Sequence, residues 1–271
     1  MPAAPNQDHR IWRRRTSGVR LALWFGWLAL AALTVYSWQV MTQDTIWSFV
    51  ADAPRQAADI GSRMVPPRWE YAPKLWRALW DTNNIASLGT LLAIVFAVPV
   101  AFQAARNTTP SVRFVRPIAL LAIVASRSIN SLIWALLLVS ILGPGLLAGI
   151  IAIALRSIGF VGKLLYEALE EVDQTQVEAV AATGASRAQV VTYGMVPQIM
   201  PAFAGISIFR WDINIRESTI LGLVGAGGIG LQLEASLNTL AWPQVSLILL
   251  LIFGSVVVSE WVSAKVRHAI T

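Results

Sequence analysis

Long apolar runs alternate with shorter polar links along most of this 271-residue chain. About 20 apolar residues in a helix, at about 1.5 Å per residue, cross a bilayer core of about 30 Å. Six runs are of that order, and each predicts one transmembrane helix. They cover residues 21–41, 85–105, 117–142, 145–165, 199–221 and 244–262. The pattern therefore predicts an all-α polytopic membrane protein with six transmembrane helices.

The basic residues favour one orientation of these spans. Cytoplasmic links of membrane proteins carry an excess of Lys and Arg. Basic residues occur before the first run and after the second, fourth and sixth, while the links near residue 143 and over residues 223–243 contain none. We therefore expect a cytoplasmic basic N-terminus over residues 1–20, a single transmembrane domain over residues 21–271, and both termini in the cytoplasm.

The link over residues 42–84 departs from this rule, because it contains basic and acidic side chains although it should lie outside. Apolar residues recur within it at helical spacing, and they are Leu75, Trp76, Leu79 and Trp80. Two interpretations are open for these residues. They form a short amphipathic helix on the membrane surface, or they pack against the bundle.

The composition excludes several classes of function. Hydrophobic residues make up 56% of the chain and charged residues only 13%, against about a quarter charged in a soluble domain. A net charge of +6 favours nucleic acid in a soluble protein, but here the basic residues flank apolar runs, so membrane lipid and not nucleic acid is the expected neighbour. The chain has no cysteine, and its two histidines, His9 and His268, lie near its ends. No metal centre, thiol nucleophile or disulfide is therefore expected.

The longest inward-facing polar insertion, residues 167–197, predicts a helix-turn-helix between the fourth and fifth spans. Gly184 suits the left-handed conformation that ends a helix. Ser186 and Gln189 have the spacing of a capping box that starts the next helix, and Pro197 marks the entry into the fifth span. A rigid projection of this kind offers a surface to which a cytoplasmic partner protein can bind.

This insertion resembles the E-A-A–G–I-x-L-P loop of ABC importer permeases. The matching residues are Glu178, Ala179, Gly184 and Pro197. Three positions differ from the family pattern, and they are Val180 in place of alanine, Gly194 in place of isoleucine and Val196 in place of leucine. The resemblance implies that the insertion is the coupling loop, which docks on a separate ATPase. It also implies a second permease chain, identical or homologous, a dimer of ATPase subunits that binds ATP and Mg²⁺, and an extracytoplasmic solute-binding protein, all at the cytoplasmic membrane of a prokaryote.

A second segment, residues 222–243, is rich in glycine. Residues 225–230 fit G-x-G-x-x-G, but the dinucleotide fingerprint needs a preceding strand in a soluble βαβ unit, and here a span precedes it. Backbone that bends or packs closely at the outer mouth of a pathway is the better interpretation, because glycine allows both. The candidate outer gate therefore consists of Gly225, Gly227, Gly228 and Gly230.

Further resemblance indicates which branch of the permease family this chain is most similar to. Residues 221–230 are similar to the phosphonate and methionine branches, and residues 127–138, 238–245 and 257–267 are similar to the phosphonate branch. The resemblance covers most of residues 85–268. It implies import of phosphonate or a related phosphorus oxyanion, phosphate or phosphite.

Charged residues inside the predicted spans are a further candidate for function. They are Arg127, Arg156, Arg210, Asp212, Arg216 and Glu217. An Arg at the membrane centre costs roughly 2.5–3.5 kcal/mol on insertion scales, so these side chains should face the bundle interior or a partner. The candidate substrate path consists of Arg127, Asn130, Arg210 and Arg216. Internal ion pairing with Asp212, four residues from Arg216 on one helix face, or with Glu217 is the alternative.

The sequence thus predicts a transport subunit without catalytic residues, the permease of an ATP-driven ABC importer. The chain has no G-x-x-x-x-G-K-[ST] motif, so it is expected to bind no cofactor itself and ATP is expected on the separate ATPase. An ion-coupled secondary transporter is the alternative, but such folds often contain internal repeats and none is evident here. A membrane-embedded hydrolase is disfavoured, because neither a cysteine nor an intramembrane histidine is available.

The predicted orientation can be tested in a chain without native cysteine. Ser62→Cys should react with a membrane-impermeant maleimide on intact cells, because residue 62 lies in an outer link. Ser186→Cys should react only after the membrane is opened, because residue 186 lies in the cytoplasmic insertion. The reverse labelling pattern would refute this topology.

Overall fold

The computed structural model describes residues 17–270, and every regular element in that range is helical. The chain divides into two compact units, Met1–Asp59 and Ile60–Thr271. The sequence placed residues 21–271 in one domain, and that assignment stays a prediction. Most of the predicted basic N-terminus, including His9, lies outside the described residues.

The first unit contains α1 (Ser17–Thr42), which includes the first predicted span. None of the residues in its apolar window is buried within the chain. A helix that is apolar all round and has no core to pack on is suited to lipid or to another membrane helix. The amphipathic helix α2 (Trp47–Met64) follows and extends across the boundary between the units.

Helix α3 (Ala72–Ala104) follows a 3₁₀ turn, η1 (Trp69–Tyr71), and is longer than the predicted second span. Its 33 residues extend about 50 Å, well beyond the bilayer core. Leu75, in its first turn, is fully buried in a cluster with Ile229 and Leu247. Residues 75–80 therefore do not form a separate surface helix, because they belong to the span helix itself; Leu75 and Leu79 pack on the bundle, whereas Trp76 and Trp80 are exposed.

The third predicted span, residues 117–142, consists of two helices. α4 (Val115–Ser128) and α5 (Ser131–Leu142) meet at an angle of 87°. Each is only about 18–21 Å long, so neither alone crosses a core of about 30 Å. The prediction of one continuous helix is wrong here because Asn130 caps α5, its Oδ1 accepting the Leu132 N–H at 3.1 Å. An N-cap starts a new helix wherever it occurs.

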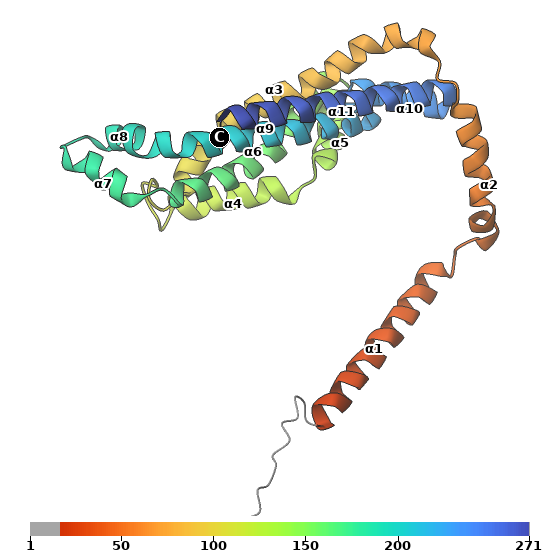
Figure 1. Cartoon of the computed structure of the whole chain (residues 1–271), viewed down its shortest axis with the longest axis horizontal. Helices are drawn as coiled ribbons and strands as arrows, with labels where there is room; N and C mark the ends of the chain where they lie inside the picture. The colour runs from red at the N-terminus through yellow and green to blue at the C-terminus, as the bar shows by residue number, and fades with distance from the viewer. Residues whose placement is uncertain (1–16, 271) are drawn as a thin grey trace, which may run out of the picture. The chain divides into compact units, whose positions relative to one another are not determined.

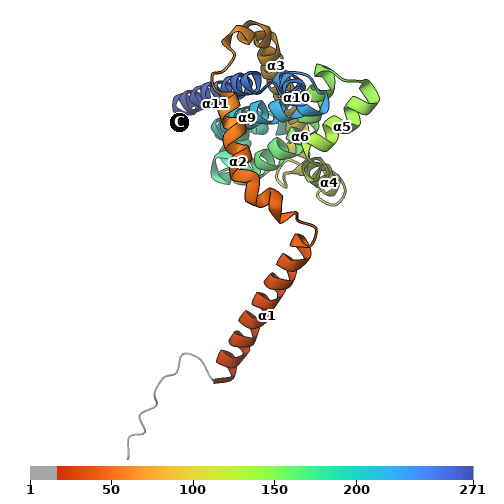
Figure 2. The ribbon, with the colours of Figure 1, turned by 90° about the vertical axis from the view of Figure 1, so that its right-hand side faces the viewer.

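Helix α6 (Leu146–Glu170) lies in the middle of the second unit, where it contacts α3, α4, α5 and α9 (Val196–Leu221) (Figure 2). Two of its glycines lie where other backbones cross it. A Cβ at Gly149 would lie 3.1 Å from the Ala226 carbonyl oxygen, and one at Gly159 would lie 2.5 Å from the Ile123 carbonyl oxygen. Small residues at such crossings let membrane helices approach closely.

Shorter elements lie at the two ends of this unit (Figure 1). α7 (Gln174–Ala182) and α8 (Arg187–Val190) project at one end, and the other end carries the 3₁₀ turn η3 (Gly222–Val224) and α10 (Ile229–Asn238). The last helix, α11 (Trp242–Ile270), packs against α3, α9 and α10. Over residues 17–270, five helices are long and apolar enough to cross a membrane, or six if the bent pair α4–α5 is one span. The six spans predicted from the sequence agree with the count in which α4 and α5 together form one span.

The crossing of α4 and α6 provides a matched pair of glycine variants. Gly159→Ala places a methyl group 2.5 Å from a backbone oxygen, so we expect destabilisation of roughly 1–3 kcal/mol. Gly162→Ala, almost one turn later, meets Ile123 Cγ1 at 3.4 Å, an ordinary contact, and should be close to neutral. Thermal unfolding of the two purified variants measures the difference. Equal melting temperatures would contradict the close approach.

Candidate functional site

The predicted helix-turn-helix is present as the α7–α8 hairpin. At its turn Gly184 has φ = +82°, in the left-handed region that glycine enters without strain. Ser186 and Gln189 form the predicted capping box, with the Ser186 N–H donating to Gln189 Oε1 at 2.8 Å and the Gln189 N–H donating to Ser186 Oγ at 3.5 Å. Glu178 and Ala179 are exposed on α7. The hairpin therefore presents these residues to any partner at this end of the bundle.

The second helix of the hairpin is continuous with the fifth span. α8 passes through a five-residue π-helical turn, η2 (Val191–Met195), into α9. Pro197 lies in the first turn of α9, a position at which a missing N–H removes no hydrogen bond within that helix. Pro197 thus marks the start of α9, as the sequence indicated. The hairpin and the span it leads into share one helical rod.

Gly194 and Gln198 hold α7 against this rod. A Cβ at Gly194 would lie 3.3 Å from the Val177 Cα, so the glycine that replaces the family's isoleucine permits a close contact with α7. Gln198 Oε1 accepts the Asp173 N–H at 2.9 Å, and Gln198 Nε2 donates to the Gly194 carbonyl at 2.7 Å. Asp173 in turn caps α7 by accepting the Thr175 N–H at 2.9 Å. Gln198 was not identified from the sequence, because Asp173, which it binds, belongs to a different helix.

The glycine-rich segment forms a compact turn between α9 and α10. Three of its residues have φ between +75° and +85°, and they are Gly225, Gly227 and Gly228. A Cβ at Gly228 would lie 2.5 Å from Thr82 Oγ1, and one at Gly230 would lie 2.0 Å from the Thr219 carbonyl oxygen. The Thr82 hydroxyl also accepts the Ile229 N–H at 2.7 Å. The bend and the close packing that the glycines indicated are therefore both present, within this one chain.

Glu217 bridges two arginines inside the bundle. Its Oε1 lies 2.9 Å from Arg156 Nη1 and its Oε2 lies 3.3 Å from Arg210 Nη2. The Arg210 side chain is 2% exposed, donates to Ser157 Oγ at 2.8 Å and lies 5.1 Å from the ring centre of Phe160. The Arg156 side chain is 31% exposed. Arg210 is therefore a buried, fixed group, whereas Arg156 reaches the surface of the chain.

Arg156 also contacts the break between α4 and α5. Its Nη1 donates to Asn130 Oδ1 at 3.4 Å and to Ser131 Oγ at 3.3 Å. Asn130 is exposed, and so is Arg127 in the last turn of α4. The structure thus brings Asn130 of the predicted path together with Arg156, which the sequence analysis left out of that path.

Arg216 and Asp212 form the predicted ion pair on α9. Asp212 is buried and accepts a second hydrogen bond from Ser259 Oγ at 2.7 Å, while the Arg216 side chain is 49% exposed. Three of the four predicted path residues therefore reach the surface of the chain, and Arg210 does not. Their role in a solute path stays a prediction.

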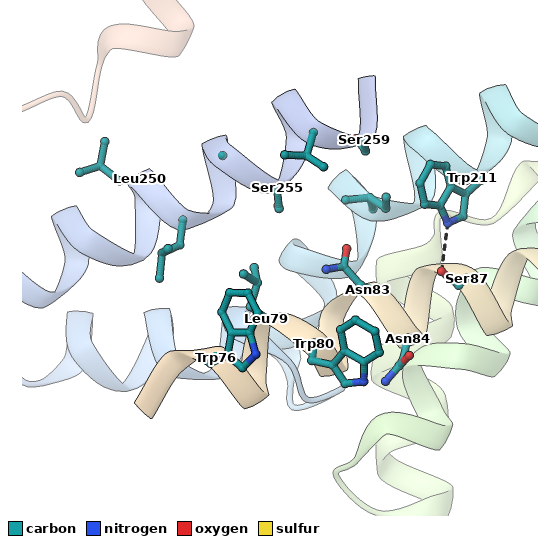
Figure 3. A pocket seen from close by; sticks show the side chains of 14 residues that line it. Trp76, Leu79, Trp80, Asn83, Asn84, Ser87, Trp211, Leu250, Ser255 and Ser259 are labelled. Carbon is teal, nitrogen blue, oxygen red and sulfur yellow. Dashed lines mark hydrogen bonds between the residues drawn. The ribbon is translucent and has the colours of Figure 1, made fainter. Parts of the chain in front are cut away.

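A separate groove of about 580 Å³ lies between α3, α9 and α11 (Figure 3). Figure 3 shows the indole rings of Trp76 and Trp80 on α3, and the Trp211 Nε1 donating to Ser87 Oγ at 3.0 Å. Most of its lining is apolar, and none of the described residues that line it is basic. A groove of this character does not attract an anion, so the charged group around Glu217 is the better candidate for a solute site.

Known proteins resemble this chain over most of its length. Residues 89–268 match the family model described as binding-protein-dependent transport system inner membrane component. The phosphite transport system permease protein PtxC of Stutzerimonas stutzeri is 40% identical over 210 residues, which are 78% of this chain and 76% of that protein. The phosphate-import permease protein PhnE of Mycolicibacterium smegmatis is 37% identical over 227 residues, which are 82% of this chain and 42% of that protein. The fold is similar to a chain of the inward-facing MetNI methionine ABC transporter, with a TM-score of 0.66 and 20% identity over 75% of this chain and 99% of that chain.

These matches confirm the resemblance to ABC importer permeases and set aside the secondary transporter. In such transporters a separate subunit hydrolyses ATP and a binding protein delivers the solute, so this multi-pass inner membrane protein is a transport subunit and not an enzyme. Permeases of this kind carry no cofactor, and within residues 17–270 no group of three or more His, Asp or Glu side chains is arranged to hold a metal ion. The chain belongs to the family of inner membrane components of binding-protein-dependent transport systems.

Proposed function

We propose that this permease carries a phosphorus oxyanion (phosphonate, phosphite or phosphate) across the cytoplasmic membrane of a prokaryote. The observation that carries the proposal is an excess of positive charge inside the predicted spans. Four arginines stand there against two carboxylates, namely Arg127, Arg156, Arg210 and Arg216 against Asp212 and Glu217. An anion needs such compensation at membrane depth, and arginine binds the oxygens of phosphate-like groups in a bidentate way. The relatives named for phosphite and phosphate, at 40% and 37% identity, support the same class of solute.

The α7–α8 hairpin is the proposed contact with a dimer of ATPase subunits. Glu178, Ala179 and Gly184 are exposed there, and Gln198 connects the hairpin to α9. Because α8, η2 and α9 follow one another without a break, a displacement of the hairpin is passed along one rod. That rod also carries Arg210 and Glu217, so ATPase movement reaches the charged group through a single rigid element.

The glycine-rich turn, with Gly225, Gly227, Gly228 and Gly230, is the proposed outer gate. It lies at the end of the second unit opposite the hairpin (Figure 1). With the hairpin and both termini in the cytoplasm, this turn faces the solute-binding protein. Its glycines with positive φ let the backbone adopt conformations that other residues rarely adopt. The compact turn that results is suited to closing the outer end of the pathway.

A second permease chain, identical or homologous, is the proposed other wall of the pathway. Arg127, Asn130 and Arg216 are exposed when this chain is taken alone. Charged side chains at membrane depth face a bundle interior or a water-filled cavity and not lipid. A partner that covers this surface therefore encloses the candidate substrate path, of which Arg210 forms the buried inner support.

Uptake by the complete transporter tests the solute class. Cells that express this chain with its ATPase and binding protein should accumulate radiolabelled phosphite, phosphate or methylphosphonate in an ATP-dependent way. Excess unlabelled oxyanion should compete, and methionine should not, because methionine has no net charge and its ammonium group is repelled by the arginines. Accumulation of methionine without any phosphorus oxyanion would refute the proposed solute.

Two variants at Gly184 test the coupling role. No atom lies within 4 Å of a Cβ at this position, so only backbone strain separates the variants. Gly184→Val should lower uptake about tenfold, because a β-branched residue resists the left-handed region, and stimulation of the ATPase by loaded binding protein should fall with it. Gly184→Asn should stay near wild type, because Asn tolerates this region. Equal membrane amounts are the control, and wild-type uptake by Gly184→Val would contradict coupling through this turn.

A further inference from the structure

Two arginines share one carboxylate inside the bundle, which leaves a positive charge without an internal partner. Glu217 divides its two oxygens between Arg156 and Arg210. Among the described residues, no second carboxylate forms an ion pair with either guanidinium. Charge at membrane depth requires compensation, so an anion from outside the chain has a place here.

Only one of the two arginines is available to such an anion. Arg210 is 2% exposed and its Nε is occupied by Ser157. The Arg156 side chain is 31% exposed and is held by the longer contacts to Asn130 and Ser131, at 3.4 Å and 3.3 Å. An incoming oxyanion therefore reaches the charge excess through Arg156.

The place where Arg156 emerges is independently unsuited to lipid. It adjoins the break between α4 and α5, where Ser128 and Asn130 are both exposed on this chain. Irregular backbone at membrane depth is tolerated only where protein or water surrounds it. The break therefore faces a partner subunit or a water-filled path, and Arg156 faces the same space.

We propose that Arg156, with Asn130, binds the solute oxyanion in the pathway, and that Glu217 is the resident counter-anion that the solute displaces from Arg156. This inference rests on the proposed function and deepens it. In the empty site the Glu217 carboxylate neutralises Arg156. When a tetrahedral oxyanion arrives, its oxygens replace Glu217 Oε1 on the guanidinium, while Glu217 Oε2 keeps its contact with Arg210. The exposed Asn130 amide supplies a further hydrogen bond, while the buried Ser131 keeps its contact with Arg156.

Competition by Glu217 gives the site a property that transport needs. A path must bind its solute well enough to admit it and weakly enough to release it. The Glu217 carboxylate already pairs with the same guanidinium, so it lowers the net free energy gained when the solute binds. When the solute leaves, Glu217 pairs with Arg156 again. Glu217 is thus a positioning residue that acts through Arg156 and need not touch the solute.

Binding and uptake of radiolabelled phosphite test this exchange. Binding is measured by equilibrium dialysis on the purified complex of permease and ATPase, and uptake is measured with the binding protein in proteoliposomes. Glu217→Gln keeps the size of the side chain but removes the competing charge, so phosphite should bind about tenfold more tightly while maximal uptake falls. Arg156→Gln should bind phosphite about tenfold more weakly, and Arg156→Lys, which keeps the charge, should lose less.

Arg116→Gln is the matched control, because Arg116 pairs with Glu170 at 3.3 Å near the opposite end of α4, and it should change neither measurement. If the wild type takes up none of phosphite, phosphate and methylphosphonate, the proposed function fails and this inference fails with it; if it takes up only one of the other two, that oxyanion replaces phosphite in both measurements. If the wild type takes up phosphite but Glu217→Gln and Arg156→Gln bind it as Arg116→Gln does, only this inference is overturned. Recovery of each complex is measured alongside. If the Arg156→Gln complex does not assemble, the Glu217→Gln and Arg156→Lys variants test the inference instead. A purely structural ion pair predicts no gain in phosphite affinity for Glu217→Gln.

Discussion

Helix α6 can occupy the middle of the bundle because glycine stands at the points where other backbones cross it. Gly159 accommodates the last turns of α4, and its N–H donates to Ser126 Oγ at 2.8 Å. This crossing places the end of α4, and with it the break before α5, beside Arg156 one turn away on α6. The arrangement of the charged group therefore depends on a contact between small residues, in which close approach replaces the hydrophobic driving force that is absent in lipid.

Polar groups inside the bundle satisfy one another across three helices. Asn214 on α9 donates to Thr90 Oγ1 on α3 at 2.7 Å and to Ser157 Oγ on α6 at 3.1 Å, and Ser157 accepts from Arg210. In a low-dielectric interior each of these bonds is strengthened, and each group left without a partner is costly. The network thereby fixes Arg210 and leaves Arg156 at its edge. One arginine is thus buried and fixed, and the other is partly exposed at the surface of the chain.

The continuous rod of α8, η2 and α9 joins both ends of the second unit. At one end it holds the hairpin through Gln198, and at the other it leads into the glycine-rich turn. Between them it carries Arg210 and Glu217. In a transporter whose ATP is hydrolysed on another subunit, such a rod is a direct physical route from the proposed ATPase contact to the charged group and the proposed gate. The π-helical turn in it lies beside α7, where Gly194 permits close packing.

The sequence by itself determined the features that rest on neighbours along the chain. Apolar runs set the spans because crossing a bilayer requires length and hydrophobicity alone, and Gly184 with Ser186 set the hairpin turn because caps and left-handed residues act within a few positions. Tertiary structure decided the rest. The break at Asn130 lies in an apolar run, and the average hydrophobicity of that run does not reveal it. Leu75 packs on residues of α10 and α11. Arg156 pairs with Glu217 only because α6 packs on α9. These features depend on contacts between residues far apart in the chain, and no local pattern specifies which distant side chain fills a given place.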